Sequence, residues 1–175
     1  CLDGRDNGLI ITGDIYNPPV LSGGILITGF KLDPETGFLY KKLSNKHEYD
    51  FRALIANGKY LNKSRYPSEG SLNHETIWSI RWTSTFGNGW EREPTIEELT
   101  TLQFKDGDFD ENFDYRNAEL VIYHEWDESF VSINEYDYVN RKFIFNKPCG
   151  HPPGSFGNQN YVVYNTKSGM SQELS

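Results

Sequence analysis

The fold is decided by the stretch FRALIANGKYLNKSRYP, residues Phe51–Pro67, in which two short apolar runs flank Asn57-Gly58. Asn-Gly adopts the positive φ angles of a tight two-residue turn, so we expect Ala53–Ala56 and Lys59–Lys63 to pair as antiparallel strands. Arg65-Tyr66-Pro67 should then leave the hairpin, because proline lacks a ladder donor and favours an extended residue before it. The stretch therefore predicts the opening of an antiparallel β-domain.

Further strands are predicted after this hairpin from their β-branched and aromatic residues. They are Ile77–Ser84, Glu119–Tyr123, Trp126–Ile133, Lys142–Phe145 and Tyr161–Tyr164. In the first of them, alternation places Trp78, Ile80 and Trp82 on one face, which we expect to be buried. A turn at Tyr138–Arg141 should join the third and fourth strands into a second hairpin.

One short helix is predicted near the middle of the chain, beginning at Pro94. Thr95 can cap it, and Glu98 stands three residues further on, the spacing of a capping box. No other helix has comparable support, so the sequence predicts an all-β protein.

The N-terminal segment consists of short β-branched runs, Leu9–Thr12, Pro19–Leu21 and Ile25–Thr28, separated by turn residues. Strands this short can follow one another around a coil with small turns, as in a parallel β-helix. They can equally form an ordinary antiparallel meander, and periodicity alone leaves both arrangements open.

Composition excludes several classes of protein. The net charge of −8 argues against a nucleic-acid partner, which requires a basic surface. No apolar run approaches the roughly 20 residues of a membrane helix, so we expect no membrane partner. Two cysteines are too few for a disulfide scaffold, and we expect no metal and no cofactor. We interpret Cys1 as a mid-chain residue, although an N-terminal cysteine can also be the lipidated residue of a bacterial lipoprotein.

Several short motifs follow one another along the chain. They are Ser22-Gly23-Gly24, Ile27-Thr28-Gly29-Phe30, Ala56-Asn57-Gly58-Lys59, Ser64-Arg65-Tyr66-Pro67, Glu119–Tyr123 with Trp126 and Ser132-Ile133, and the Tyr-x-x-x-Asn strand Tyr161–Asn165. In this order they resemble the N-terminal half of secreted right-handed parallel β-helix proteins, which include glycoside hydrolases. The resemblance covers nearly the whole chain.

This resemblance implies an architecture and a location. Residues 1–50 would form the first rungs of a right-handed parallel β-helix with a connector, residues 51–165 an inserted antiparallel β-sandwich-like domain, and residues 166–175 a polar tail. The location would be extracellular or periplasmic. The family continues with a Pro-Gly-Glu-Trp-Tyr segment and catalytic rungs, whereas this sequence has Thr166–Met170 there and then stops. We therefore expect this chain alone to be inactive.

Carbohydrate is the ligand that the aromatic residues favour, because sugars present apolar C–H faces to rings and hydroxyls to polar groups. The candidate contact residues are Trp90, Tyr66, Arg65, Arg81 and Asn88. Trp90 follows a glycine-rich loop, which makes it the best candidate for an exposed ring.

Other polar groups have simpler interpretations. Asp106–Asp114 alternates carboxylates but lacks the glycine and glutamate positions of an EF-hand loop, so we expect a solvated turn rather than a calcium site. Glu125 and Asp127 would share a face if they lay on a strand, and a glycosidase needs two such neighbouring carboxylates, but surface acids are commoner. The histidines are expected on the surface or hydrogen-bonded: His47, His74, His124 and His151.

These observations favour a non-catalytic N-terminal or accessory part of a carbohydrate-active, glycoside hydrolase-like β-helix protein that helps to bind a poly- or oligosaccharide. A polysaccharide lyase could share the same scaffold. The alternative is a stand-alone carbohydrate-binding, adhesin or assembly module, and an independent hydrolase would need Glu125 or Asp127. An incomplete β-helix would leave an open strand edge, through which we expect self-association.

Overall fold

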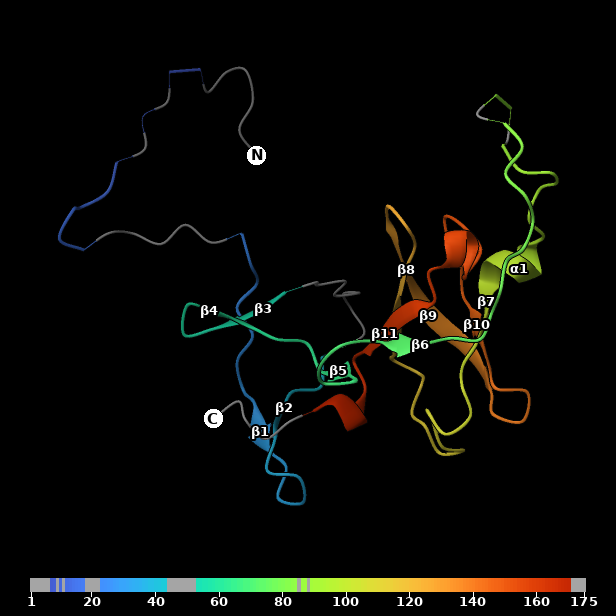
Figure 1. Ribbon diagram of the computed structural model, residues 1–175. Helices are drawn as coiled ribbons and strands as arrows, with labels where there is room; N and C mark the ends of the chain where they lie inside the picture. Colours follow the sequence, from blue (N-terminus) through green and yellow to red (C-terminus); the bar gives the residue numbers. More distant parts are fainter. Residues whose placement is uncertain are drawn as a thin grey trace. The chain divides into compact units, whose positions relative to one another are not determined.

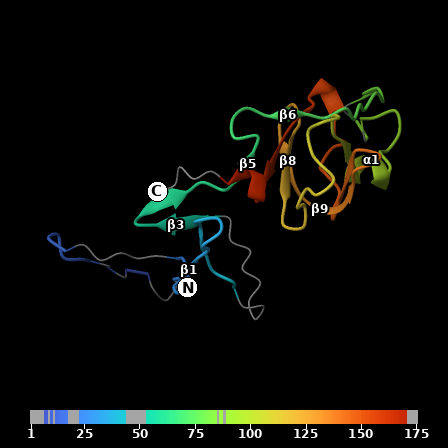
Figure 2. The same ribbon diagram turned by 90° about the horizontal axis from the view of Figure 1, so that it is seen from below.

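The computed structural model describes residues 7–8, 10, 12–17, 23–43, 53–84, 86–87 and 89–170. The chain divides into two compact units, Cys1–Asp50 and Phe51–Ser175 (Figure 1). Figure 2 shows the same ribbon from a second direction, in which the labelled strands β6, β8 and β9 again lie together. Asn88 and Pro19–Leu21 lie outside the described residues.

The described part of the first unit contains one short hairpin, β1 (Lys31–Leu32) with β2 (Leu39–Tyr40). Its turn is closed by a hydrogen bond of 2.8 Å from the Gly37 N–H to the Asp33 carbonyl. Ile25–Thr28 forms no strand, and neither do the described residues Ile10 and Thr12. The arrangement of these runs as rungs of a β-helix therefore stays a prediction.

The hairpin expected at Asn57-Gly58 is confirmed. Strand β3 (Leu54–Ala56) pairs antiparallel with β4 (Lys59–Leu61). Asn57 and Gly58 have φ angles of 51° and 75°, the left-handed conformations that a two-residue turn of this kind requires. Local turn chemistry thus specifies this element without help from distant residues.

The second unit is built on a seven-stranded sheet in which the paired strands all run antiparallel. In chain order its strands are β5 (Arg65–Tyr66), β6 (Leu72–Asn73), β7 (Thr101–Gln103), β8 (Glu119–Tyr123), β9 (Glu128–Asp137), β10 (Lys142–Phe145) and β11 (Asn160–Tyr164). The spatial order is β5-β11-β8-β9-β10-β7, with β6 also paired to β11. The all-β, antiparallel class is therefore confirmed, as is the second hairpin, in which β9 extends to Asp137.

The chain from Leu72 to Thr76 connects the two ends of this sheet. Strand β6 pairs with β11, and the next N–H, that of His74, donates to the Gln159 carbonyl at 2.9 Å. One residue later the Glu75 N–H donates to the Gln103 carbonyl of β7 at 2.7 Å. This segment thus hydrogen-bonds to both ends of the sheet, which holds the sheet in a curled form and covers the outer edge of β7.

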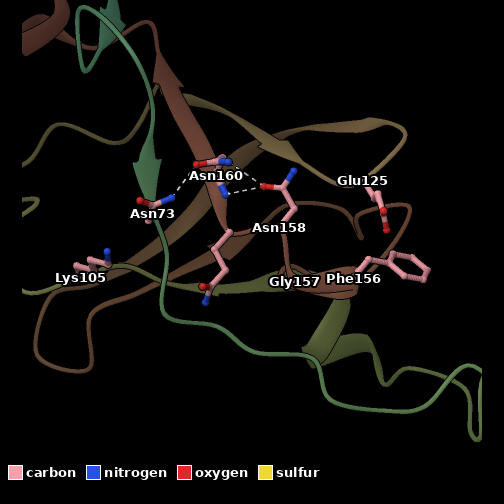
Figure 3. A pocket seen from close by; sticks show the side chains of 8 residues that line it. Asn73, Lys105, Glu125, Phe156, Gly157, Asn158 and Asn160 are labelled. Carbon is pink, nitrogen blue, oxygen red and sulfur yellow. Dashed lines mark hydrogen bonds between the residues drawn. The ribbon is translucent and has the colours of Figure 1, made fainter.

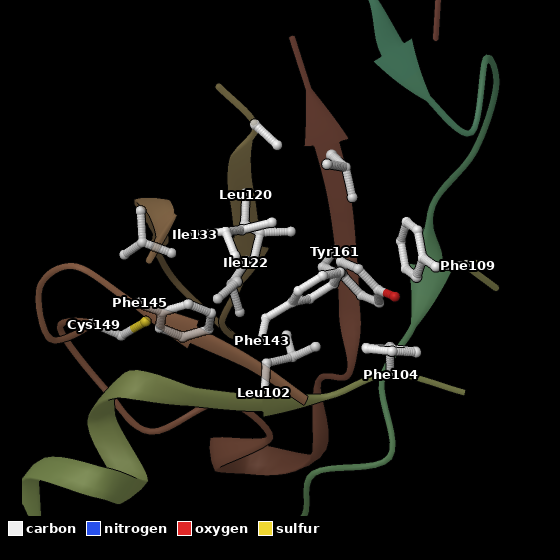
Figure 4. Packing of buried hydrophobic residues seen from close by; sticks show 13 residues of the cluster. Leu102, Phe104, Phe109, Leu120, Ile122, Ile133, Phe143, Phe145, Cys149 and Tyr161 are labelled. Atoms are coloured by element: carbon white, nitrogen blue, oxygen red, sulfur yellow. The ribbon is translucent and has the colours of Figure 1, made fainter. Parts of the chain in front are cut away.

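The core lies inside this curled sheet (Figure 4). Its fully buried aliphatic and aromatic side chains come from every long strand, and they are Leu102, Phe104, Leu120, Ile122, Val131, Phe143, Tyr161 and Val163. Val121 and Val162 point away from this cluster and are buried as well, so the central strands β8 and β11 are covered on both faces. Burial of apolar area is the main stabilising contribution here.

Two predictions in the middle of the chain had opposite outcomes. Helix α1 (Ile96–Thr100) is capped as expected, since Thr95 Oγ1 accepts from the Glu98 N–H and Glu98 Oε2 accepts from the Thr95 N–H. The strand expected over Ile77–Ser84 is wrong, because only Trp82 pairs there, in a single bridge to Trp90. None of the helices in the described ranges is both long and apolar enough to cross a membrane.

Candidate functional site

All four tryptophans of the chain meet around one phenylalanine, forming the tryptophan cluster of Trp78, Trp82, Trp90, Trp126 and Phe156. Phe156 lies at ring-centre distances of 5.1 Å from Trp90 and 4.7 Å from Trp126. Trp90 contacts Trp78 and Trp82 edge to face, at 6.0 and 4.9 Å. Trp82 is 44% exposed, so the expectation of a buried face is wrong for Trp82, whereas Trp78 and Trp90 are partly buried. The cluster lies outside the main hydrophobic core and is partly open to solvent.

Phe156 is held in this cluster by an unusual backbone. It lies in the 3-10 turn Ser155–Gly157 with φ 58° and ψ 17°, in the left-handed region. A residue with a side chain costs about 1–2 kcal/mol there relative to its preferred conformations. The turn nevertheless keeps Phe156, whose ring lies between Trp90 and Trp126 in the cluster.

An open pocket of about 560 Å³ lies beside Phe156 (Figure 3). Most of its lining side chains are amides or charged groups, and the lining comprises Asn73, Lys105, Glu125, Phe156, Gly157, Asn158, Gln159 and Asn160. In Figure 3 Lys105 lies on one side, Glu125 and Phe156 lie on the opposite side, and Asn158 and Asn160 lie between them. The pocket thus combines one ring wall with a polar floor, and we call it the amide pocket.

The floor of the amide pocket is a connected series of side-chain amides. Asn73 Nδ2 donates to Asn160 Oδ1 at 2.7 Å, and Asn160 Nδ2 donates to Asn158 Oδ1 at 3.1 Å. Asn158 Nδ2 in turn donates to the His124 carbonyl at 2.9 Å. Because each amide fixes the next, the network presents its remaining donors and acceptors in a defined arrangement.

The charged side chains of the pocket are not paired with other side chains. Neither the Lys105 ammonium nor the Glu125 carboxylate forms an ion pair or hydrogen bond within the described residues, whereas the Lys105 carbonyl accepts from the Asp108 N–H at 3.2 Å. Gln159 donates through Nε2 to the Thr76 carbonyl at 3.3 Å, which leaves its Oε1 as an acceptor. Donors and acceptors therefore alternate around a space beside the Phe156 ring.

Trp126 lies at the tip of the turn between β8 and β9. The His124 N–H donates to the Asp127 carbonyl at 2.9 Å, so Glu125 and Trp126 occupy the two central positions of the turn. Because these residues form a turn rather than a strand, Glu125 and Asp127 do not share a face. Glu125 lines the amide pocket, whereas Asp127 Oδ2 lies 4.0 Å from His151 Nε2.

A buried polar cluster underlies this turn. His124 Nε2 lies 2.9 Å from Ser129 Oγ, which also accepts from the Gly150 N–H at 3.1 Å. Burial lowers the pKa of His124 and raises the pKa of the Cys149 thiol to about 11. His124 Nδ1 has no hydrogen-bond partner among the described residues, so no acid orients this imidazole as in a nucleophilic triad. The cluster supports the turn and is closed to substrates.

The acidic loop after β7 is tied into the fold. Asp108 Oδ2 accepts from the Tyr161 hydroxyl at 3.4 Å, and burial raises the pKa of Asp108. Asp114 instead pairs with Arg116 at 3.4 Å. Within the described ranges, no group of three or more histidine, cysteine or acidic side chains could hold a metal ion.

The structure describes four of the five residues that the sequence indicated for sugar contact, and it places them in two different parts of the second unit. Trp90 belongs to the tryptophan cluster, and the Arg81 carbonyl accepts from the residue after Trp90 at 2.9 Å. Arg65 is already engaged, donating to the carbonyls at positions 68 and 70. The Tyr66 hydroxyl donates to a backbone carbonyl of the acidic loop at 3.2 Å. Asn88 is outside the described residues.

Sequence reasoning missed the residues of the amide pocket, Asn73, Asn158 and Asn160, and gave no role to Phe156. Asn73 and Asn160 are 87 positions apart, so no local pattern could place them together. The one local signal was the amide run 158–160 directly after a loop rich in glycine and proline.

Comparison with protein-family models, with curated protein sequences and with solved structures finds no match to this chain.

Proposed function

We propose that the unit Phe51–Ser175 binds carbohydrate in the amide pocket. The observation that carries this proposal is the amide network opening beside the Phe156 ring. Sugars need several donors and acceptors for adjacent hydroxyls together with an apolar wall for their C–H face. Ligand sites typically combine a few fixed polar groups with an aromatic surface in this way.

The wider setting of this proposal rests on the motif resemblance. In it, the chain is the non-catalytic N-terminal part of a secreted, glycoside hydrolase-like protein, with residues 1–50 beginning a right-handed parallel β-helix and the second unit as its sandwich-like insert. The location is extracellular or periplasmic. This step is analogy at the level of fold. Self-association through an open β-helix edge belongs to the same proposal, and light scattering that shows a clean monomer would contradict it.

A stand-alone carbohydrate-binding module is the alternative, and one observation favours it. The lining residues of the amide pocket all belong to the second unit, from Asn73 to Asn160. A site complete within this unit does not need catalytic rungs beyond Ser175. In this alternative the isolated chain keeps its full affinity for sugar.

The test is a glycan array probed with the full chain and three variants. Phe156→Gly removes the ring, and glycine adopts φ 58° without strain, so the loop should keep its course. Asn73→Ala removes one amide of the floor, while Asn112→Ala removes an exposed amide outside the pocket.

We expect the parent chain and Asn112→Ala to bind the same glycans, and the two pocket variants to lose most of that signal. Circular dichroism and the thermal midpoint of each variant establish that it is folded. A parent chain that binds no glycan, or pocket variants that bind as the parent does, would refute the proposal.

A further inference from the structure

Trp126 is presented to solvent at the tip of the turn after β8. Its side chain is 75% exposed, and its one ring contact among the described residues is with Phe156. A single exposed ring is ordinary on a protein surface, but Trp126 is in ring contact with Phe156, which lines the amide pocket. The other tryptophans of the cluster pack against one another, so Trp126 offers the freest ring face of the four.

The amide pocket and Trp126 are fixed relative to each other by two contacts. Phe156 lines the pocket and also touches the Trp126 ring at 4.7 Å. Asn158, in the pocket floor, donates to the His124 carbonyl, which is part of the turn that carries Trp126. A ligand seated in the pocket therefore meets Trp126 at a defined position across the Phe156 wall.

We propose that Trp126 forms a second sugar subsite, so that the ligand is an uncharged oligosaccharide of at least two rings. This inference rests on the proposed function of the amide pocket. One sugar ring occupies the pocket, and the next stacks on Trp126. Because the pocket is open (Figure 3), the chain of the glycan can continue beyond both subsites.

The charges around Trp126 decide the class of glycan. Glu125, Asp127 and Glu128 surround it in the sequence, and all are exposed. No lysine or arginine of the described chain pairs with them. These carboxylates accept hydrogen bonds from sugar hydroxyls but repel a uronate or sulfate. Lys105 lies on the opposite side of the pocket, away from Glu125 (Figure 3).

The experiment is calorimetric titration of the full chain with mannose, xylose, galactose and glucose, with the β-1,4-linked tetramer of each, and with tetramannuronate. The last probe matches mannotetraose in linkage and length but carries a carboxylate on every ring. Trp126→Ala deletes the second subsite. Tyr60→Ala is the matched control, because Tyr60 is 76% exposed on β4 and lines neither subsite.

For the parent chain and Tyr60→Ala we expect a tetramer to bind about tenfold or more tightly than its monosaccharide, the effect of one aromatic anchor. Trp126→Ala should lower tetramer affinity to that of the monosaccharide and leave monosaccharide binding unchanged. Tetramannuronate should bind more weakly than mannotetraose.

Three results would overturn the inference while leaving the amide pocket as a sugar site. In the first, Trp126→Ala binds the tetramer with unchanged affinity. In the second, Trp126→Ala loses affinity for the monosaccharide and the tetramer by the same factor. In the third, the parent chain binds tetramannuronate at least as tightly as mannotetraose. If no probe of this panel binds the parent chain, the proposed function fails and the second subsite fails with it.

Discussion

Acidification should destabilise this protein through His74, whose imidazole ring is buried. The side chain is 1% exposed, and neither ring nitrogen has a partner among the described residues. This corrects the expectation that every histidine is on the surface or hydrogen-bonded. Burial lowers the pKa of His74 from 6.5 to about 4, against an opposing influence of the backbone at Thr76 and together with a further lowering from His124.

The sign and size of the effect follow from this pKa. Between pH 6.5 and about 4 the unfolded chain binds a proton at His74 and the folded chain does not. The stabilising contribution is therefore complete above pH 6.5 and is lost as the pH falls towards 4. The interval between the two pKa values corresponds to about 3 kcal/mol of unfolding free energy.

The assay is urea unfolding from pH 7.5 to 4, followed by tryptophan fluorescence, for the parent chain, His74→Leu and His151→Gln. His74→Leu replaces the buried imidazole with an apolar side chain of similar size. The unfolding free energy of His74→Leu at pH 7.5 should equal or exceed that of the parent, because an unsatisfied buried polar group costs about 1–3 kcal/mol. On acidification to pH 4, its unfolding free energy should fall by about 3 kcal/mol less than that of the parent. His151→Gln replaces a partly exposed imidazole and controls for the removal of a histidine at another position. Parallel curves for parent and His74→Leu would refute the reasoning.

Two further predictions concern local structure. Thr95→Ala removes the N-cap of α1 and should lower the unfolding free energy by about 1 kcal/mol in urea titrations, whereas Thr95→Ser keeps the hydroxyl and should cost little. An equal loss of unfolding free energy in Thr95→Ala and Thr95→Ser would show that the hydrogen bond from the Glu98 N–H to the Thr95 hydroxyl does not stabilise the helix. Gly154→Ala should destabilise by about 3 kcal/mol, because a Cβ there, at φ 82°, would collide with the Thr76 carbonyl. Gly157→Ala, at φ 81° in open space, should cost only about 1 kcal/mol. Equal thermal midpoints for these two variants would contradict the packing argument.

The elements that the sequence predicted correctly carry their information locally. Asn57-Gly58 specifies its turn through backbone conformations, and Thr95 with Glu98 specifies a helix start through hydrogen bonds within one turn. Alternation over Ile77–Ser84 failed because a strand also needs a neighbour to pair with. There the aromatic side chains pack into the tryptophan cluster, and only one bridge forms.

The candidate site could not be predicted in the same way, because it exists only after the sheet has formed. Pairing of β6 with β11 brings Asn73 beside Asn160, and the loop before β11 brings Phe156 to Trp126. Composition led to the hypothesis of a sugar ligand, since rings and polar groups together suit sugars, and that hypothesis stays a prediction. It could not indicate which of the 26 aromatic residues, 11 Phe, 11 Tyr and 4 Trp, would be exposed beside amides.

The most direct test of a sugar site at this place is a nuclear magnetic resonance titration of the ¹⁵N-labelled full chain with the tightest glycan from the array. The account predicts shifts concentrated in the side-chain amides of Asn73, Asn158 and Asn160 and in the indole N–H of Trp126. Shifts centred instead on β5, around Arg65, or an unchanged spectrum at saturating sugar, would contradict it.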